Sequence, residues 1–237
     1  MRCFVIGDIH GCLGELTCLM ENLPLTPADR VVFLGDYIDR GPDSKGVVSY
    51  LLGAAKNIDS EFIFLKGNHE DMLLSYLGFD GSHGDVFLVN GGNATLASYG
   101  VHPRQLSREH VRDRIAQDHL EFYFGLQSYY VHSGFLCVHA GIQPQKSLNA
   151  QNPLDMLWIR NEFISQPHKL PNTIIFGHTP QREVLFDLPW KIGIDTGVVY
   201  GNKLSCIELE EKTLFQVERG ARRVRQTSIK KKWKHLP

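Results

Sequence analysis

The sequence lacks several features that would assign it to a broad class of proteins. Its 237 residues include five cysteines, an odd number, and no CxxC pair. We therefore expect neither a disulfide framework nor a zinc site built from thiolates, and a reducing compartment is the simpler environment. No hydrophobic run approaches membrane-spanning length, and the apolar run at residues 3–6 is too short for the core of a secretion signal. These absences predict a cytoplasmic protein without a membrane span.

A strong charge of one sign is also absent from the chain as a whole. The formal net charge is -1 and hydrophobic residues make up 43%, which is ordinary for a globular domain and favours neither nucleic acid nor a membrane as the main partner. The end of the chain differs, because it carries basic side chains and no acidic ones at Arg219, Arg222, Arg223, Arg225, Lys230, Lys231, Lys232 and Lys234. We predict one domain over residues 1–217 and a basic tail over residues 218–237. The tail is interpreted as solvated, with contact to nucleic acid or an acidic surface as the alternative.

The first third of the chain alternates between apolar runs and amphipathic stretches. Apolar runs of strand length lie at residues 3–6, 31–34 and 62–65. Helix-like stretches lie between them at residues 12–22 and 44–55, the second with Asp43 or Ser44 as a plausible cap. This alternation predicts parallel strands in a sheet that is buried on both faces.

The rest of the chain has a different pattern. Residues 72–127 are typical of helices and loops, with a break at Asn90-Gly91-Gly92 and a polar helix at residues 107–117. Further strands are expected at residues 135–138, 173–176, 184–186, 192–194 and 204–209. Several of these are close together in the sequence, which predicts antiparallel or mixed pairing in an α/β fold.

Residues capable of binding metal or phosphate follow five of the predicted strands. They occur in the segments Gly7-Asp8-Ile9-His10-Gly11, Gly35-Asp36-Tyr37-Ile38-Asp39-Arg40-Gly41, Gly67-Asn68-His69-Glu70, His139-Ala140-Gly141 and Gly177-His178-Thr179. A lone histidine beside a strand is usually structural, but five such strand ends together indicate a ligand site. Oxygen donors mixed with imidazoles, and no thiolates, suit Mn²⁺, Fe or Zn²⁺. Two ions need a bridging carboxylate, and Asp36 is the candidate.

These five motifs, in this order, resemble the phosphoprotein phosphatase family of calcineurin-like metallophosphoesterases, and most closely its short bacterial and phage members. The resemblance covers residues 7 to about 200 and implies a metallophosphoesterase catalytic domain over residues 1–217. The implied fold is a central β-sandwich of mixed sheets flanked by helices. The implied cofactor is a pair of divalent metal ions, most simply Mn²⁺, with a water molecule shared between them as the nucleophile.

The resemblance also implies a role for each matching residue. Asp8, His10 and Asp36 would bind the first ion, and the second would be bound by Asp36, Asn68, His139 and His178. His69 would be the general acid, with Asp39 holding its imidazole. Arg40 and Arg160 would bind the substrate phosphate, although Asp39 and Arg40 could instead form a surface ion pair and Arg160 could be a structural residue of a helix. Asn90-Gly91-Gly92, and residues 195–197 with Tyr200, match elements near the substrate cleft of the family.

The substrate is the least determined part of this prediction, because the same metal chemistry serves different phosphoesters. The leading hypothesis is a serine/threonine protein phosphatase with a phosphorylated protein or peptide as substrate. The alternative is a symmetrical diadenosine tetraphosphate hydrolase. Within the resemblance, the presence of both Asp39 and Glu70 favours the phosphatase. A catalytically inactive scaffold is disfavoured because no implied ligand is substituted.

Overall fold

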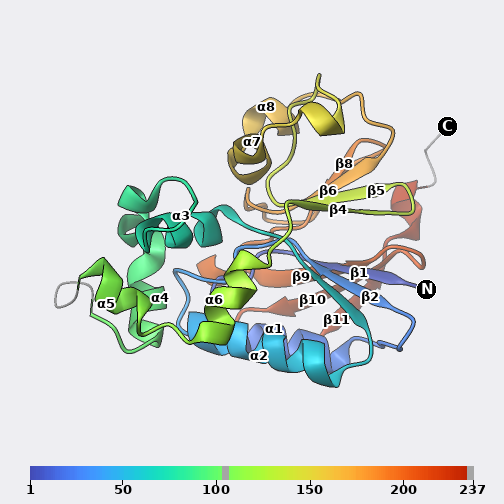
Figure 1. Ribbon diagram of the computed structural model, residues 1–237. Helices are drawn as coiled ribbons and strands as arrows, with labels where there is room; N and C mark the ends of the chain where they lie inside the picture. The colour runs from blue at the N-terminus through green and yellow to red at the C-terminus, as the bar shows by residue number, and fades with distance from the viewer. Residues whose placement is uncertain (103–106, 234–237) are drawn as a thin grey trace.

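The computed structural model describes residues 1–102 and 107–233, which form two mixed β-sheets packed face to face (Figure 1). The first sheet has the strand order β11-β10-β9-β1-β2-β3. Its strands are β1 (Cys3–Ile6), β2 (Arg30–Phe33), β3 (Glu61–Phe64), β9 (Lys203–Glu208), β10 (Thr213–Glu218) and β11 (Arg225–Ser228). The second sheet has the order β4-β5-β6-β8-β7. Its strands are β4 (Tyr129–His132), β5 (Phe135–Val138), β6 (Thr173–Phe176), β7 (Leu185–Asp187) and β8 (Lys191–Gly193).

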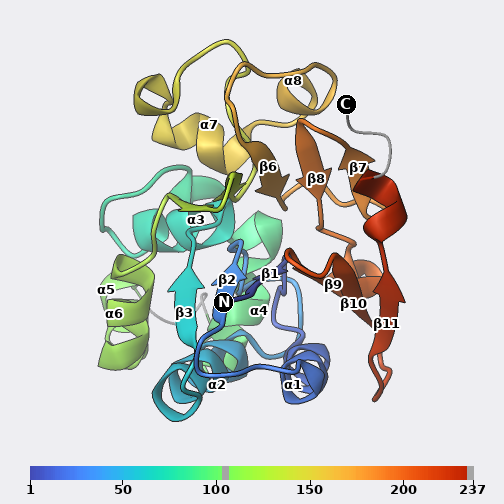
Figure 2. The same ribbon diagram turned by 90° about the vertical axis from the view of Figure 1, so that its right-hand side faces the viewer.

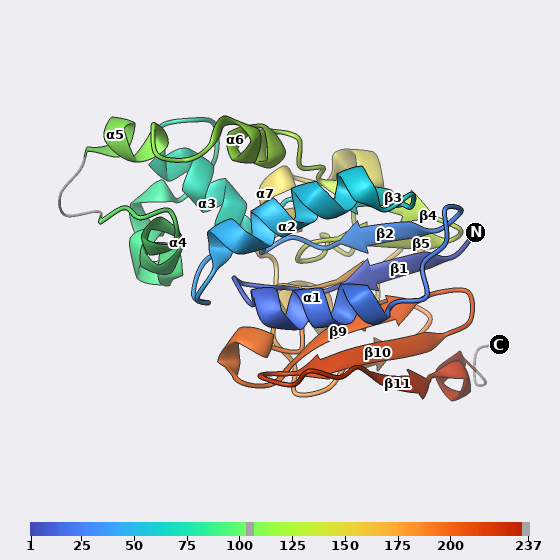
Figure 3. The ribbon, with the colours of Figure 1, turned by 90° about the horizontal axis from the view of Figure 1, so that it is seen from below.

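Helices cover the outer faces of both sheets. The helices α1 (Leu13–Asn22) and α2 (Ser44–Asn57) lie along the first sheet (Figure 3), and α7 (Pro153–Trp158) and α8 (Asn161–Ile164) cover the second (Figure 2). The remaining helices gather at the end of the sandwich where β1 and β2 finish; they are α3 (Asn68–Tyr76), α4 (Asn93–Ser98), α5 (Arg108–Arg112) and α6 (Gln117–Phe124). The predicted α/β sandwich of mixed sheets flanked by helices is therefore confirmed.

The apolar runs form strands because both faces of each strand are covered. In β1, Phe4 and Ile6 belong to the core shared with α1 and α2, whereas Cys3 and Val5 belong to the core between the sheets. Parallel pairing of β1 with β2 and of β2 with β3 places three consecutive carboxyl ends at one edge of the sheet. Those ends carry the first three chemical motifs.

Two expectations about local structure need correction. The helix expected over residues 107–117 is shorter, because α5 ends at Arg112 and a separate helix, α6, begins only at Gln117. The end of the chain does not lie free in solvent, since β11 pairs with β10 and Ile229 is buried. The Trp233 ring lies 6.0 Å from that of Phe186 in β7. An apolar residue on either side of the lysines therefore anchors residues 225–233, and Lys234 lies outside the described residues.

No helix in the described part of the chain is both long and apolar enough to cross a lipid bilayer.

Candidate metal centre and active site

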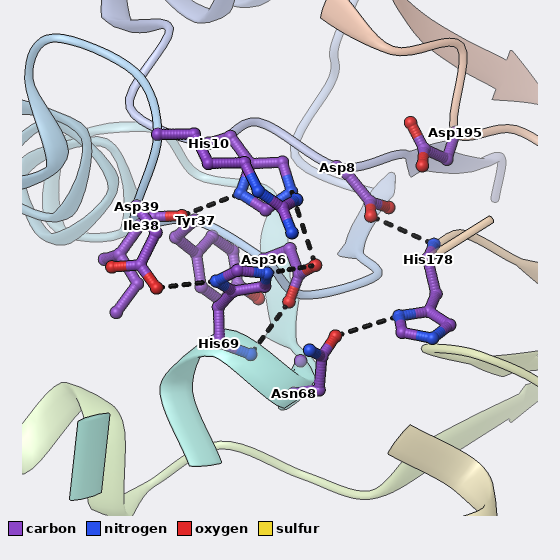
Figure 4. Close-up of polar contacts among 12 residues, drawn as sticks. Asp8, His10, Asp36, Tyr37, Ile38, Asp39, Asn68, His69, His178 and Asp195 are labelled. Carbon is purple, nitrogen blue, oxygen red and sulfur yellow. Dashed lines mark hydrogen bonds and ion pairs between the residues drawn. The ribbon is translucent and has the colours of Figure 1, made fainter. Parts of the chain in front are cut away.

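The predicted metal ligands meet at one edge of the sandwich, beyond the carboxyl ends of five strands. All six are buried, with at most 4% of each residue exposed: Asp8, His10, Asp36, Asn68, His139 and His178. Figure 4 labels Asp8, His10, Asp36, Asn68 and His178 around a common centre. Segments up to 170 residues apart in the sequence contact one another here, since the backbone N–H of His178 donates to Asp8 Oδ2 at 2.9 Å.

Left-handed backbone is concentrated in these loops. The φ angles of His10, Asp36, Asp39, Arg40 and His178 are 47°, 54°, 73°, 66° and 64°. Residues with a Cβ atom rarely adopt this conformation, because the side chain crowds the following carbonyl group. Such strain persists when surrounding contacts hold it, and it is typical of functional sites. Here it turns polar side chains inward at the point where a strand would otherwise continue.

Gly35 shows how closely the loops approach one another. Its φ is 103°, and a Cβ atom at this position would lie 2.5 Å from the backbone nitrogen of Gly67. Any side chain would therefore push the loop that follows β2 away from the start of α3. This contact brings Asp36 next to Asn68 and His69.

Asp36 lies at the centre of the cluster. Its Oδ2 atom is 3.4 Å from His10 Nε2 and 3.9 Å from His69 Nε2, and its Oδ1 atom is 3.4 Å from His139 Nε2. Burial would raise the pKa of Asp36, but the surrounding histidines outweigh this effect and lower it. Two sets of side chains close enough to hold a metal ion share this carboxylate: His10, Asp36 and His69, and Asp36, His139 and His178. In the first set His69 is held by Asp39, whereas Asp8 was the ligand expected from the sequence.

Backbone carbonyl groups set the orientation of two of these imidazoles. His10 Nδ1 donates to Ile38 O at 2.7 Å, and His139 Nδ1 donates to Leu34 O at 2.9 Å. Burial lowers the pKa of His10 to about 3 and also lowers that of His139, which favours the neutral form of both rings. In each ring the proton is on Nδ1, and Nε2 therefore presents a lone pair to the cluster.

The residues of the cluster fit a pair of divalent cations. Asp8 Oδ1 and His178 Nε2 are buried and have no hydrogen-bond partner among the described residues. His139 Nε2 faces Asn68 Oδ1 at 3.0 Å, although both atoms are acceptors. Convergent acceptors without a donor are the arrangement that metal ligands adopt. Imidazole and oxygen donors together suit Mn²⁺, Fe or Zn²⁺.

The buried carboxylates of the cluster also fit divalent cations. Burial, with the charges of Asp195 and Asp36 nearby, raises the pKa of Asp8 well above its usual value. Burial likewise raises the pKa of Asp195 to about 7. Buried carboxylates that face one another are unfavourable unless a positive charge lies among them. Divalent cations bound at this centre would supply that charge.

Asp39 and His69 form a separate buried pair. His69 Nδ1 lies 2.6 Å from Asp39 Oδ2, and neither residue is more than 1% exposed. Burial lowers the pKa of His69, but the carboxylates of Asp36 and Asp39 outweigh it and raise the pKa above the usual value. Asp39 therefore fixes the ring so that Nε2 points toward Asp36 (Figure 4).

The two predicted phosphate-binding arginines lie at the same edge with different surroundings. Arg40 donates to His10 Nε2 at 2.7 Å, and its guanidinium carbon lies 5.6 Å from the centre of the Tyr200 ring. Arg160 is exposed and donates to the backbone carbonyl of His178 at 3.0 Å. Arg160 also donates to Thr179 Oγ1 at 3.4 Å. Both arginines are thus held by hydrogen bonds, but Arg160 is exposed to solvent and Arg40 is half-buried.

Glu70 has a structural role that the sequence motif did not reveal. Its buried carboxylate accepts hydrogen bonds from the backbone N–H groups of Asp36, Tyr37, Ile38 and Gly67, at 2.8 to 3.3 Å. It joins the loop after β2 to the start of α3, which fixes the Asp36 carboxylate relative to Asn68. Glutamate three residues after an N-cap position was the available signal, but the partner loop is 32 to 34 residues away in the sequence.

Comparisons with known proteins agree on the family and the fold, although the relatives are named for different activities. The sequence profile of the family described as "Calcineurin-like phosphoesterase" matches residues 1–213. Serine/threonine-protein phosphatase 1 of Salmonella typhimurium is 30% identical, covering 87% of this chain and 91% of that protein. Bis(5'-nucleosyl)-tetraphosphatase PrpE (asymmetrical) of Bacillus cereus is 29% identical, covering 92% and 94%. The solved structure of a protein proposed to be a diadenosine tetraphosphatase has a TM-score of 0.67 at 24% identity, covering 92% of this chain and 93% of that chain, and supports the fold.

Proposed function

The chain belongs to the calcineurin-like phosphoesterase family, and from that premise we propose that it removes phosphate from phosphoserine and phosphothreonine in proteins. Members of this family are hydrolases that use divalent metal ions. The substrate, the choice of Mn²⁺ and the individual residue roles are the parts that we propose.

The buried pair of Asp39 and His69 is the observation that favours a phosphoserine or phosphothreonine ester as the substrate. A serine or threonine alkoxide is a poor leaving group, so its departure is accelerated by a proton donor, an effect of about 10²–10⁴-fold for a well-placed acid. His69 Nδ1 is held by Asp39 at 2.6 Å, which leaves Nε2 to face the centre of the cluster. This arrangement suits an ester whose leaving group needs a proton.

The proposed reaction is a single displacement. When bound, the two cations supply an acidified water molecule and neutralise the charge of the phosphate. The acidified water would lose one proton to solvent, and its oxygen would form a bond to phosphorus as the bond to the leaving oxygen breaks. The leaving oxygen would take the proton from His69 Nε2. Arg40 and Arg160 bind phosphate oxygens through paired N–H groups, which lysine could not do in the same geometry. Asp8, His10, Asp36, Asn68, His139 and His178 hold the cations.

Dinucleoside tetraphosphate hydrolysis is the second candidate, because relatives at 29% identity are named for that activity. The leaving group in that reaction is itself a phosphate, which departs without strong assistance from an acid. A tetraphosphatase would therefore depend much less on His69 than a protein phosphatase would.

The deciding experiment measures turnover of a phosphoserine peptide and of diadenosine tetraphosphate by one Mn²⁺-loaded preparation, for the wild type and His69→Ala. We expect the phosphopeptide to be preferred, and the substitution to slow it by about 10²-fold or more. A preference for the dinucleotide, with a small effect of His69→Ala, would contradict the proposal.

A further inference from the structure

We propose that Thr95, assisted by Ser44, is a positioning residue that holds Asp39 and, through Asp39, the imidazole of His69. The inference rests on the proposed role of His69 as proton donor. It adds Thr95, which lies on α4 and outside every motif that the sequence displayed.

The first observation concerns the backbone of the loop that follows β2. Asp39 and Arg40 are consecutive left-handed residues, with φ angles of 73° and 66°. Asp39 N donates to Thr95 Oγ1 at 2.9 Å and also lies 3.0 Å from Ser44 Oγ. Two hydroxyl groups thus stabilise the N–H of a residue in an unfavourable conformation, and this conformation directs the Asp39 carboxylate toward His69.

The second observation concerns the carboxylate itself. Thr95 Oγ1 donates to Asp39 Oδ1 at 2.5 Å, while His69 Nδ1 contacts Asp39 Oδ2 at 2.6 Å. Each carboxylate oxygen therefore has one short partner. A threonine hydroxyl has a single proton, so Ser44, whose hydroxyl oxygen is 3.0 Å from that of Thr95, is left to donate to Thr95. Asp39, Ser44 and Thr95 are all fully buried, and no solvent competes with these bonds.

Gly91 explains how α4 comes close enough for Thr95 to reach Asp39. Its φ is 110°, and a Cβ atom there would lie 2.6 Å from Arg40 Cγ. Arg40 N donates to Gly91 O at 3.2 Å. The break at Asn90-Gly91-Gly92 therefore packs directly against the loop that follows β2, and α4 starts immediately after it at Asn93.

A hydroxyl that only satisfies buried polar groups would have a different effect on catalysis. Loss of such a group lowers the rate with every substrate alike. A hydroxyl that aims the acid matters most for esters with poor leaving groups, since good leaving groups depart without a proton. The dependence of rate on the leaving group therefore separates the two roles.

The test compares kcat for phenyl phosphate, which has the poorer leaving group, and 4-nitrophenyl phosphate in Mn²⁺-loaded protein. Thr95→Val should slow phenyl phosphate about tenfold and 4-nitrophenyl phosphate much less, whereas Thr95→Ser should restore both rates. Tyr99→Phe is the matched control, because it removes another buried hydroxyl at the end of α4, one that contacts His119 and Tyr123. It should leave the ratio of the two rates unchanged. An equal loss on both substrates, or no loss, would overturn the proposal.

Two further measurements make the test independent of the identity of the natural substrate. In an Asp39→Asn background, Thr95→Val should cause no additional loss, and additive effects would refute a role through Asp39. In metal-free protein, the NMR signal of the His69 Nδ1 proton, assigned by its disappearance in His69→Ala, should shift in Thr95→Val and stay unchanged in Tyr99→Phe. This signal needs no turnover, so an unchanged shift contradicts the positioning role even if the protein phosphatase proposal fails.

Ser44→Ala serves if Thr95→Val does not fold. Alanine keeps the start of α2 helical and removes the second hydroxyl that contacts Asp39 N. We expect kcat to depend on the leaving group in the same way but by a smaller factor, with a fall of about threefold for phenyl phosphate. Equal rates of wild type and Ser44→Ala on both esters would count against the proposal.

Discussion

Buried carboxylates lie at both ends of the parallel strands of the first sheet, but they have different partners at the carboxyl edge and at the amino edge. At the carboxyl edge, the carboxylates of Asp8, Asp36 and Asp195 are buried together, and no arginine or lysine pairs with them in the described ranges 1–102 and 107–233. At the amino edge, the buried carboxylate of Asp29 accepts from Arg2 Nη2 at 2.6 Å, and from the backbone and hydroxyl groups of Thr26 at 2.8 Å. One edge is left needing cations, whereas the other is complete by itself.

This difference indicates that the amino edge contributes more to the stability of the fold than the carboxyl edge does. Left-handed residues and facing carboxylates make the carboxyl edge unfavourable until a ligand binds, as expected for a functional site. The amino edge compensates with matched ion pairs and with the C-terminal segment, whose Ile229 is buried and whose Trp233 packs on Phe186. Activity and stability should therefore respond to different substitutions.

Removal of divalent ions should have the largest effect. Chelation should abolish hydrolysis of 4-nitrophenyl phosphate, and added Mn²⁺ should restore it, because Asp8 Oδ1 and His178 Nε2 have no hydrogen-bond partner among the described residues. The melting temperature should also rise with Mn²⁺ concentration, since an ion that binds only the folded state stabilises it. Calorimetry and steady-state kinetics on one metal-washed sample measure both, and full activity in chelator would contradict the metal centre.

Asp8→Asn should show the opposition between activity and stability most directly. Turnover should fall by about 10²-fold or more through loss of a metal ligand. The metal-free protein should become more stable by about 1 kcal/mol, because a buried charge next to Asp36 and Asp195 disappears. Urea unfolding in chelator measures the change in stability. A loss of stability there would contradict the claim that facing carboxylates destabilise the metal-free carboxyl edge.

Trp233→Ala should affect stability alone. Loss of the partly buried ring against Phe186 should lower the free energy of unfolding by about 2 kcal/mol, with kcat unchanged at a temperature where the variant is folded. Exposed Lys231 provides the control, since Lys231→Ala removes a charge from the same short helix without removing the ring. Equal stability of the two variants in urea would mean that residues 229–233 do not anchor the amino edge.

Acid should expose the contribution of Asp29, the smallest of these effects. Burial would raise the pKa of Asp29, but hydrogen bonds from Arg2 and Thr26 outweigh it and lower the pKa below the usual value. The carboxylate therefore stabilises the fold above the unfolded-state pKa of about 4, and this contribution, about 1 kcal/mol, is lost as the pH falls further. Wild-type stability should decline more steeply than that of Asp29→Asn between about pH 5 and pH 3. Parallel declines would exclude this role.

Much of the architecture could be predicted from the sequence because it depends on local patterns. Apolar runs of four residues gave β1, β5 and β6 with the expected boundaries, and Asp43 caps α2 by accepting from Gly46 N at 2.7 Å. Three strands were not predicted: β4, β10 and β11. Two residues of β4 and all of β11 are exposed, and each is a strand because a neighbour supplies its hydrogen bonds. β10 is mostly buried, but the polar residues Thr213, Gln216 and Glu218 interrupt its apolar pattern.

The same distinction applies to the candidate site. Asp8 and His139 could be identified as candidate ligands from the sequence, because each lies beside a glycine-containing turn directly after an apolar strand. Thr95 was not, because nothing within α4 marks it, and its partner Asp39 is 56 residues away. Glu70 was noticed for its motif, but its contacts to the backbone N–H groups of another loop depend on tertiary packing.

The outermost strand of the first sheet has a consequence for how copies of the protein meet one another. A sheet that ended at β10 would present an apolar strand with unpaired backbone groups, a template on which a second molecule could add its own strand. β11 covers it with Arg225, Gln226, Thr227 and Ser228, all exposed. A short polar strand with a charged first residue is a poor template for such pairing.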